Sequence, residues 1–313
     1  MSDRATREAF GETLTELVDE GHDVVAVDAD LSKSTTTAKF AAAHPDRFFN
    51  VGIAEQNMID TAAGLAVSGK IAFTGSFAVF ATGRAYDQVR NTVCYSKLDV
   101  KLAPTHSGVT VGPDGGSHQM LEDIALMRVL PGMRVLVPAD YHAAKGAIRV
   151  AATTPGPFYI RLGRACVPQV YEKGFEFEIG KANVVREGSD VTLAACGLMV
   201  SQALEAARIL DGEGVSAEVV DVATIKPLDA EKISASASKT GAVVACEEHS
   251  IIGGLGSAVA EVLGEMSPVP LRRIGVRDAF GTSGAPSELL TYFGLTVEDI
   301  AGAARDAIAA KAR

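Results

Sequence analysis

Strand-length apolar runs alternate with segments of helical periodicity along almost the whole chain, and this rhythm limits the possible folds more than any other feature. Residues 23–28 (DVVAVD) form an apolar run between two acids, and the segment before them carries Phe10, Leu14 and Leu17 on one helical face. Buried strands that alternate with helices assemble into parallel sheets with helices on both faces. The pattern therefore predicts an α/β protein.

The same rhythm divides the 313 residues into two series. In the first series, Asp140 is the predicted N-cap of a helix that ends by Thr154. The periodicity lapses over residues 167–178 before a second series begins. Strands are predicted at residues 71–74, 100–103, 134–137 and 158–162, and then at 191–195, 215–222 and 242–246. We therefore predict two domains, residues 1–172 and residues 179–313, each a mainly parallel sheet with helices on both faces.

Charge and composition narrow the range of partners. The chain has 29 Lys plus Arg against 39 Asp plus Glu, a formal charge of −10 that on average repels nucleic acid and anionic membranes. No stretch approaches the roughly 18 apolar residues of a membrane span, and no signal peptide is visible. The four cysteines have neither a disulfide nor a zinc spacing. We expect a cytoplasmic protein that binds no nucleic acid and no membrane, although local cations could still hold an anionic small molecule.

A glycine-rich loop, residues 105–119 (THSGVTVGPDGGSHQ), directly follows the strand predicted at 100–103. In a parallel sheet, ligands bind at the carboxyl ends of the strands. His106 and His118 flank Asp114 in this loop, and its glycines permit a close approach to a ligand. The loop is a candidate site, although its polar residues alone fit a surface loop equally well. The other four histidines are isolated and are expected to be solvated or to cap helices: His22, His44, His142 and His249.

Two further segments carry candidate residues. Glu55 lies in residues 51–58 (VGIAEQNM), at the start of a predicted helix, where the helix dipole favours a glutamate even without a function. Phe77 and Phe80 stand three residues apart beside Gly75, a pattern that by itself is more typical of a core than of a ring-binding surface. Neither segment identifies a site on its own.

Taken together, in this order and at this spacing, the three segments resemble the pyrimidine-binding part of transketolase, a thiamine diphosphate enzyme. The most specific part of the pattern is a Thr-His pair, an aspartate eight residues after that histidine, and a His-Gln pair four residues further on. Residues 243–250 (VVACEEHS) make the second predicted domain similar to the transketolase C-terminal domain. The resemblance thus covers essentially the whole chain.

The resemblance implies roles at the cofactor. Glu55 corresponds to the catalytic glutamate that hydrogen-bonds N1′ of the aminopyrimidine ring, a contact through which the cofactor's own amine becomes the base that activates it. Phe77 and Phe80 correspond to aromatic residues on which this ring stacks. A third aromatic residue of the family is missing, and residues 82–84 (TGR) stand near its expected place.

The resemblance also implies roles at the sugar. His106 and His118 correspond to catalytic histidines that contact the sugar's oxygens and phosphate. Asp114 corresponds to the acid that recognises the hydroxyl next to the donor carbonyl, and Arg164 to a phosphate-binding arginine. A second phosphate-binding arginine is expected within residues 30–38, which contain none. The alternative cations near that segment are Lys33 and Lys39.

A partner subunit follows from what the sequence lacks. The family binds the cofactor's diphosphate and Mg2+ through a Gly-Asp-Gly motif followed by an asparagine, on a domain that precedes the pyrimidine-binding one. No Gly-Asp-Gly occurs in these 313 residues. We therefore expect the C-terminal subunit of a split transketolase, active only as a hetero-oligomer with a subunit that carries this domain. The expected reaction transfers a two-carbon ketol unit from a ketose, expected to be a ketose phosphate, to an aldose.

Three alternatives stay open. The beta subunit of a thiamine-dependent 2-oxo acid dehydrogenase shares the two-domain plan, and deoxyxylulose phosphate synthase shares the end of the loop. Neither of these two enzyme families has a histidine that corresponds to His106. Residues 253–257 (GGLGS) follow a strand and open a helix, a weak dinucleotide-binding pattern that would indicate an NAD-dependent dehydrogenase. Tight backbone packing is the other interpretation of these glycines.

Overall fold

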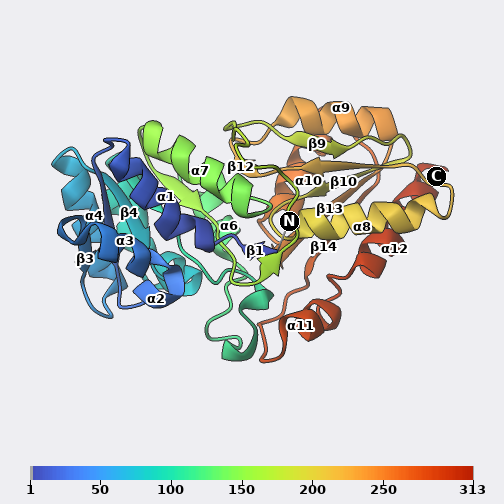
Figure 1. Ribbon diagram of the computed structural model, residues 1–313. Coiled ribbons are helices and arrows are strands. Elements are labelled where there is room, and N and C mark those ends of the chain that lie inside the picture. Colours follow the sequence, from blue (N-terminus) through green and yellow to red (C-terminus); the bar gives the residue numbers. More distant parts are fainter. Residues whose placement is uncertain (1–2, 313) are drawn as a thin grey trace.

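The computed structural model describes residues 3–312 and shows two α/β units, one built mainly by each half of the chain (Figure 1). The elements of the first half are β1 (Arg4–Ala5), α1 (Glu8–Asp19), β2 (Val24–Asp28), α2 (Ser32–Thr35), α3 (Thr37–Ala43), η1 (Pro45–Arg47), β3 (Phe48–Asn50), α4 (Glu55–Val67), β4 (Ile71–Gly75), η2 (Val79–Arg84), α5 (Tyr86–Gln88), η3 (Val89–Tyr95), β5 (Val100–Leu102), η4 (Val109–Asp114), α6 (Asp123–Arg128), β6 (Arg134–Leu136), α7 (Tyr141–Thr153), β7 (Phe158–Ile160) and β8 (Cys166–Val167). Those of the second half are β9 (Asn183–Arg186), β10 (Val191–Ala195), α8 (Met199–Asp211), β11 (Ala217–Asp221), β12 (Thr224–Lys226), α9 (Ala230–Thr240), β13 (Val243–Ser250), α10 (Leu255–Met266), β14 (Leu271–Val276), α11 (Pro286–Tyr292), α12 (Val297–Ala309) and η5 (Ala310–Ala312). Of the η segments, η2 and η3 are π-helical and the others are 3₁₀ turns.

Seven strands form the larger sheet, in the order β12-β6-β7-β5-β4-β2-β3, and five form the smaller one, in the order β14-β13-β10-β11-β9. Neighbouring strands in both sheets are parallel except β12 with β6 and β9 with β11. Helices lie on both faces of each sheet (Figure 1), so the predicted class is confirmed. Among the described residues, no helix has both the length and the apolar character needed to span a membrane.

Strand β2 shows how the sequence builds these layers. All five of its residues are buried. Because side chains alternate between the faces of a strand, Val24 and Ala26 pack into the core cluster that includes α1, whereas Val25 and Val27 pack into the cluster that includes α4. A strand that is covered on both faces therefore appears in the sequence as the continuous apolar run from which it was predicted.

Strand β13 continues past Cys246, where the prediction ended it. Two acids and a histidine follow Cys246, and such residues are rarely buried without partners. In the structure Glu247, Glu248 and His249 are all buried. His249 is therefore not solvated. Its Nε2 accepts from Ala125 N–H, in the first turn of α6, at 3.4 Å, so the expectation that it caps a helix is confirmed. Its Nδ1 is 2.7 Å from the carbonyl oxygen of the next residue.

The boundary between the two domains stays a prediction, and one strand crosses it. β12 comes from the second half of the chain but is an edge strand of the larger sheet, with Thr224 opposite Leu136 and Lys226 opposite Val135 on β6. The Lys226 ammonium also donates to the carbonyl oxygen of Arg128 at 2.8 Å. Main-chain ladder bonds, as well as side chains, therefore tie the two units together.

Candidate active site

The glycine-rich loop leaves the carboxyl end of β5, in the middle of the larger sheet. Its main chain bends sharply, with positive φ angles at Gly108 (80°), Gly112 (83°) and Gly115 (74°). His106 also has a positive φ of 63°, and such a conformation costs a residue with a side chain about 1–3 kcal/mol. Strain of this kind persists only where the surroundings hold it. The shape of the loop therefore depends on contacts made with the rest of the protein.

Four of the predicted site residues form one aromatic cluster. The rings of Phe77 and Phe80 are nearly parallel, with 9° between their planes and 6.0 Å between their centroids. The imidazole of His106 stacks on Phe77 at 4.0 Å. The imidazole of His118 stands edge-on to Phe77 and Phe80, at 6.1 and 5.5 Å. The cluster combines flat apolar surfaces with ring nitrogens, so it can hold a planar group and place polar atoms beside it.

Glu55 reaches this cluster through an arginine. It is the first residue of α4, as the sequence predicts, and its side chain is only 2% exposed. Nη1 of Arg84 donates to both carboxylate oxygens of Glu55, at 2.9 and 2.8 Å, and the guanidinium lies over the Phe80 ring, 4.5 Å from its centroid. Arg84 ends the π-helical segment η2, a rare conformation that is frequent at functional sites.

His106 is neutral in this environment. Burial, together with the positive charges of Arg7 and Arg164, lowers the pKa of His106 to about 3. Its Nδ1 is 2.7 Å from the Thr105 hydroxyl oxygen, and its Nε2 is 3.4 Å from Nη1 of Arg7. Because a guanidinium can only donate, Nε2 is the acceptor and Nδ1 carries the proton. His106 therefore offers the site an imidazole with an unprotonated Nε2.

Arg7 is a candidate that the sequence reasoning missed. Its Nη1 donates to the carbonyl oxygen of Ser34 at 2.9 Å, within the segment 30–38 where the resemblance predicts a second phosphate-binding arginine. Lys39, one of the two alternative cations, instead pairs with Glu12 at 2.9 Å. Because Arg7 and Ser34 are 27 residues apart in the sequence, no local pattern could have identified this arginine.

The remaining two predicted residues, Asp114 and Arg164, face each other at 3.3 Å. Arg164 also donates to the carbonyl oxygen of Val111 at 3.0 Å. Burial and the charge of Arg164 lower the pKa of Arg7, so the two guanidiniums repel each other. Arg7 bonds a carbonyl and an imidazole rather than a carboxylate. Because Asp114 pairs with Arg164 and not with Arg7, Arg7 keeps its charge uncompensated beside a neutral His106, and this part of the site is suited to an anion.

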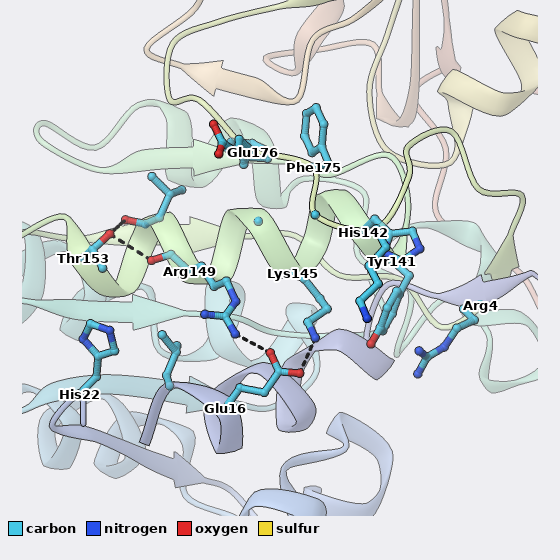
Figure 2. A pocket seen from close by; sticks show the side chains of 16 residues that line it. Arg4, Glu16, His22, Tyr141, His142, Lys145, Arg149, Thr153, Phe175 and Glu176 are labelled. Atoms are coloured by element: carbon cyan, nitrogen blue, oxygen red, sulfur yellow. Dashed lines mark hydrogen bonds and ion pairs between the residues drawn. The ribbon is translucent and has the colours of Figure 1, made fainter. Parts of the chain in front are cut away.

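A hollow of about 810 Å³ lies elsewhere, between α1, α7 and residues 173–177 (Figure 2). None of the seven predicted site residues lines it. Glu16 lies between Lys145 and Arg149 and pairs with both of them (Figure 2). Since the predicted site residues lie elsewhere, we assign this hollow no part in the candidate site.

The glycines of residues 253–257 pack against protein rather than leaving room for a ligand. At the start of α10, the Glu247 carboxylate accepts from Leu255 N–H at 2.7 Å and from Gly256 N–H at 2.8 Å. A Cβ placed on Gly254 would lie 1.9 Å from Glu247 Oε2. The helix end that would receive a dinucleotide's pyrophosphate is therefore filled by a side chain. The dinucleotide-binding alternative is wrong, and the interpretation as tight backbone packing is confirmed.

Comparison with known families gives the class of protein. The family described as transketolase, pyrimidine binding domain, matches residues 2–169, and that described as transketolase, C-terminal domain, matches residues 180–300. The chain belongs to the transketolase family. It is the part of a transketolase that consists of the pyrimidine-binding and C-terminal domains.

Two relatives and one solved structure have nearly the same length as this chain. This chain is 52% identical to the putative transketolase C-terminal section of Methanocaldococcus jannaschii, over 95% of its own length and 94% of the relative's. It is 46% identical to the 6-deoxy-6-sulfo-D-fructose transketolase subunit SqwH of a Clostridium species, over 96% and 93% of the two lengths. It is similar to the solved structure of a split gene transketolase, an inactive beta4 tetramer, with a TM-score of 0.91, 52% identity and coverage of 99% and 100% of the two chains. The predicted resemblance to the C-terminal chain of a split transketolase is confirmed.

Proposed function

We propose that this chain is the C-terminal subunit of a thiamine diphosphate-dependent transketolase that transfers a two-carbon ketol unit from a ketose phosphate to an aldose in the cytoplasm. The observation that carries the proposal is one continuous set of contacts, from Glu55 through Arg84 to the aromatic cluster of Phe77, Phe80 and the two loop histidines. A buried carboxylate, stacked rings and imidazoles are the groups that the family resemblance implies for the pyrimidine and the sugar.

The side chains fit the aminopyrimidine end of the cofactor. The Arg84 guanidinium is a planar group that lies on the Phe80 ring and donates to Glu55, so this place already accepts a flat donor. With thiamine diphosphate bound, Glu55 would hold N1′, and Phe77 and Phe80 would hold the ring. The bound cofactor supplies the nucleophilic carbon that breaks and re-forms the carbon–carbon bond.

The loop residues act on the sugar in this proposal. Neutral His106 accepts a hydrogen bond at Nε2, and the half-buried His118 exchanges protons with the sugar's oxygens. Asp114 accepts a hydrogen bond from the hydroxyl next to the donor carbonyl. A contact of this kind discriminates strongly, because a sugar without the hydroxyl leaves the carboxylate unpaired.

Arg7 and Arg164 bind the substrate's phosphate in this proposal, which gives a first prediction. Arg7→Gln is expected to raise KM for a ketose phosphate by about 10- to 100-fold, because a hydrogen bond to a charged group contributes about 1.5–3 kcal/mol. The KM for an unphosphorylated ketose should not change. Lys39→Gln, which removes a cation paired with Glu12 on the surface, is the matched control. Steady-state kinetics with both sugars decide, and an equal rise in KM for both would contradict the phosphate role.

A partner subunit holds the diphosphate and Mg2+ in this proposal. Two observations support a partner. The family models that match this chain are the pyrimidine-binding and C-terminal domains, and relatives of nearly the same length are named as a C-terminal section and as a subunit. We infer a hetero-oligomer in which the cofactor's two ends are held by different polypeptides.

Reconstitution tests the proposed function. We expect no ketol transfer from this chain alone, and transfer when it is mixed with a polypeptide bearing Gly-Asp-Gly and a downstream asparagine, together with thiamine diphosphate, Mg2+, a ketose phosphate and an aldose. Mass spectrometry of the shortened and lengthened sugars is the readout. Full activity of the chain alone would refute the need for a partner. Decarboxylation of a 2-oxo acid in place of ketol transfer would favour the dehydrogenase or synthase alternative.

A further inference from the structure

The loop of residues 105–119 belongs to the first domain, but the second domain supplies contacts that shape it. Glu248 on β13 is only 5% exposed, and its carboxylate accepts a hydrogen bond from Thr110 N–H at 2.6 Å. Thr110 lies in η4, between His106 and Asp114. The Glu248 carboxylate, from the second domain, thus fixes the main chain of the first domain's loop near the middle of that loop.

Gly108 shows how closely this carboxylate is fitted. A Cβ on Gly108 would lie 2.2 Å from Glu248 Cδ and within 2.5 Å of both carboxylate oxygens. Gly108 N–H donates to the carbonyl oxygen of Met120 at 3.0 Å, which brings the two ends of the loop together. Glycine is therefore required at 108 for two reasons, its φ of 80° and the space that Glu248 occupies.

A second contact from the second domain holds the end of the loop. Gln119 Nε2 donates to the carbonyl oxygen of Thr282 at 2.9 Å and to that of Val109 at 3.0 Å. A Cβ on Gly281 would lie 1.7 Å from Gln119 Oε1, so residues 281 and 282 lie directly against this side chain. The loop is thus held from the second domain at its middle and at its end.

Glu248 is itself firmly placed. Its main-chain oxygen accepts from Arg161 Nη2 at 3.0 Å, and Arg161 pairs with the fully buried Asp123 at 2.7 Å. Burial raises the pKa of Glu248 to about 7, although the charge of Arg161 and the bond from Thr110 act in the opposite direction. A carboxyl oxygen can accept from Thr110 N–H whether or not the group is protonated. The contact therefore does not depend on the charge of Glu248.

We propose that Glu248 is a positioning residue of the active site, which holds Gly108 and Thr110 and thereby presents His106, Asp114 and His118 to the sugar. The catalytic consequence rests on the proposed function, whereas the positioning of the loop can be tested without it. The proposal assigns a task to the second domain, on which none of the proposed catalytic residues lies.

Hydrogen exchange on the chain alone tests the positioning. Glu248→Ala leaves Thr110 N–H without its acceptor, and we expect the amides of residues 108–112 to exchange at least about tenfold faster. Glu248→Gln keeps an acceptor oxygen and should leave this exchange unchanged. Glu247→Ala is the matched control, because it removes an equally buried carboxylate of the same strand that caps α10 instead. It should accelerate exchange at the start of α10 and not in the loop.

Kinetics of the reconstituted enzyme test the consequence. We expect Glu248→Ala to lower kcat/KM for the sugars by about 10- to 100-fold, because small displacements of reacting groups have effects of this size. Glu248→Gln should recover most of the loss. The affinity for thiamine diphosphate, measured by calorimetry, should stay unchanged, because Glu55 and Phe80 lie outside the loop. Glu248→Asp, which withdraws the acceptor by one methylene, replaces the alanine variant if that variant does not fold.

The outcomes separate the two proposals. Unchanged loop exchange in a folded Glu248→Ala or Glu248→Asp chain overturns the positioning role. Faster loop exchange with unaltered sugar kinetics overturns its catalytic consequence. If the unsubstituted pair of subunits shows no ketol transfer, the proposed function fails, and hydrogen exchange alone then decides whether Glu248 holds the loop.

Discussion

Replacing Glu55 by glutamine is expected to lower kcat for ketol transfer in the reconstituted enzyme by about 10²- to 10⁴-fold, the range that proton transfer by a positioned group contributes. In the proposed site the carboxylate shares a proton with N1′ of the pyrimidine. Glutamine keeps the shape of the side chain, but its amide does not exchange a proton at neutral pH. Steady-state measurement of kcat at saturating ketose phosphate and thiamine diphosphate gives the result.

The effect of Glu55→Gln should be on catalysis and not on folding. Glutamine keeps an oxygen that can accept from Arg84, and the Arg84 side chain is 50% exposed and can be solvated, so the chain should stay folded. Asp60→Asn, an exposed acid on the same helix, is the matched control. If Glu55→Gln is as active as Asp60→Asn, Glu55 has no part in the mechanism.

The layers of the fold could be predicted because each buried strand leaves a local pattern. Strand β10 lies at residues 191–195, as predicted, since it is covered on both faces and is apolar except for Thr192. The contact between the Phe77 and His106 rings also follows from the order of strands in the larger sheet. Phe77 and Thr105 form a parallel bridge just beyond β4 and β5, so the residues that follow these two neighbouring strands meet at one edge.

Polar contacts between distant segments could not be predicted in the same way. Glu248 and Thr110 are 138 residues apart, and periodicity carries no information about such a pair. For the same reason β13 was predicted too short: whether an acid can lie in a buried strand depends on partners that come from elsewhere in the chain. The role of Arg84 also escaped prediction, because the π-helical turn that brings it over Phe80 has no apolar pattern of its own.

The largest loss of stability is expected from Asp123→Ala, about 3–5 kcal/mol, the usual cost of removing one partner of a buried ion pair. Asp123 is fully buried; its Oδ2 is 2.7 Å from Arg161 Nε and also accepts from the Tyr159 hydroxyl. Without the carboxylate, the guanidinium of Arg161 stays buried with only main-chain acceptors at Met120 and Glu248. Domains are stable by only about 5–15 kcal/mol, so equilibrium unfolding in urea should resolve the change easily.

Two further variants show whether the unpaired charge of Arg161 causes the loss of stability in Asp123→Ala. Asp123→Leu combined with Arg161→Met removes both charges, and it should recover most of the stability because apolar residues can replace a buried pair. Glu213→Ala breaks an exposed pair with Arg305 and should leave the free energy of unfolding almost unchanged. A double variant as unstable as Asp123→Ala would mean that lost packing, and not the unpaired charge, explains the effect.

The loss of stability in Asp123→Ala should depend on pH in a definite direction. Burial alone would raise the pKa of the Asp123 carboxyl, but Arg161 and His249, with the hydrogen bonds to it, hold that pKa below its ordinary value. A carboxyl with a lowered pKa stabilises the folded state above the pKa of the unfolded state, and this contribution is lost as pH falls through the folded pKa. The difference between the unsubstituted chain and Asp123→Ala should therefore be constant from about pH 5 to 8 and shrink only in stronger acid. A difference that grows on acidification would show that Asp123 is protonated in the native protein.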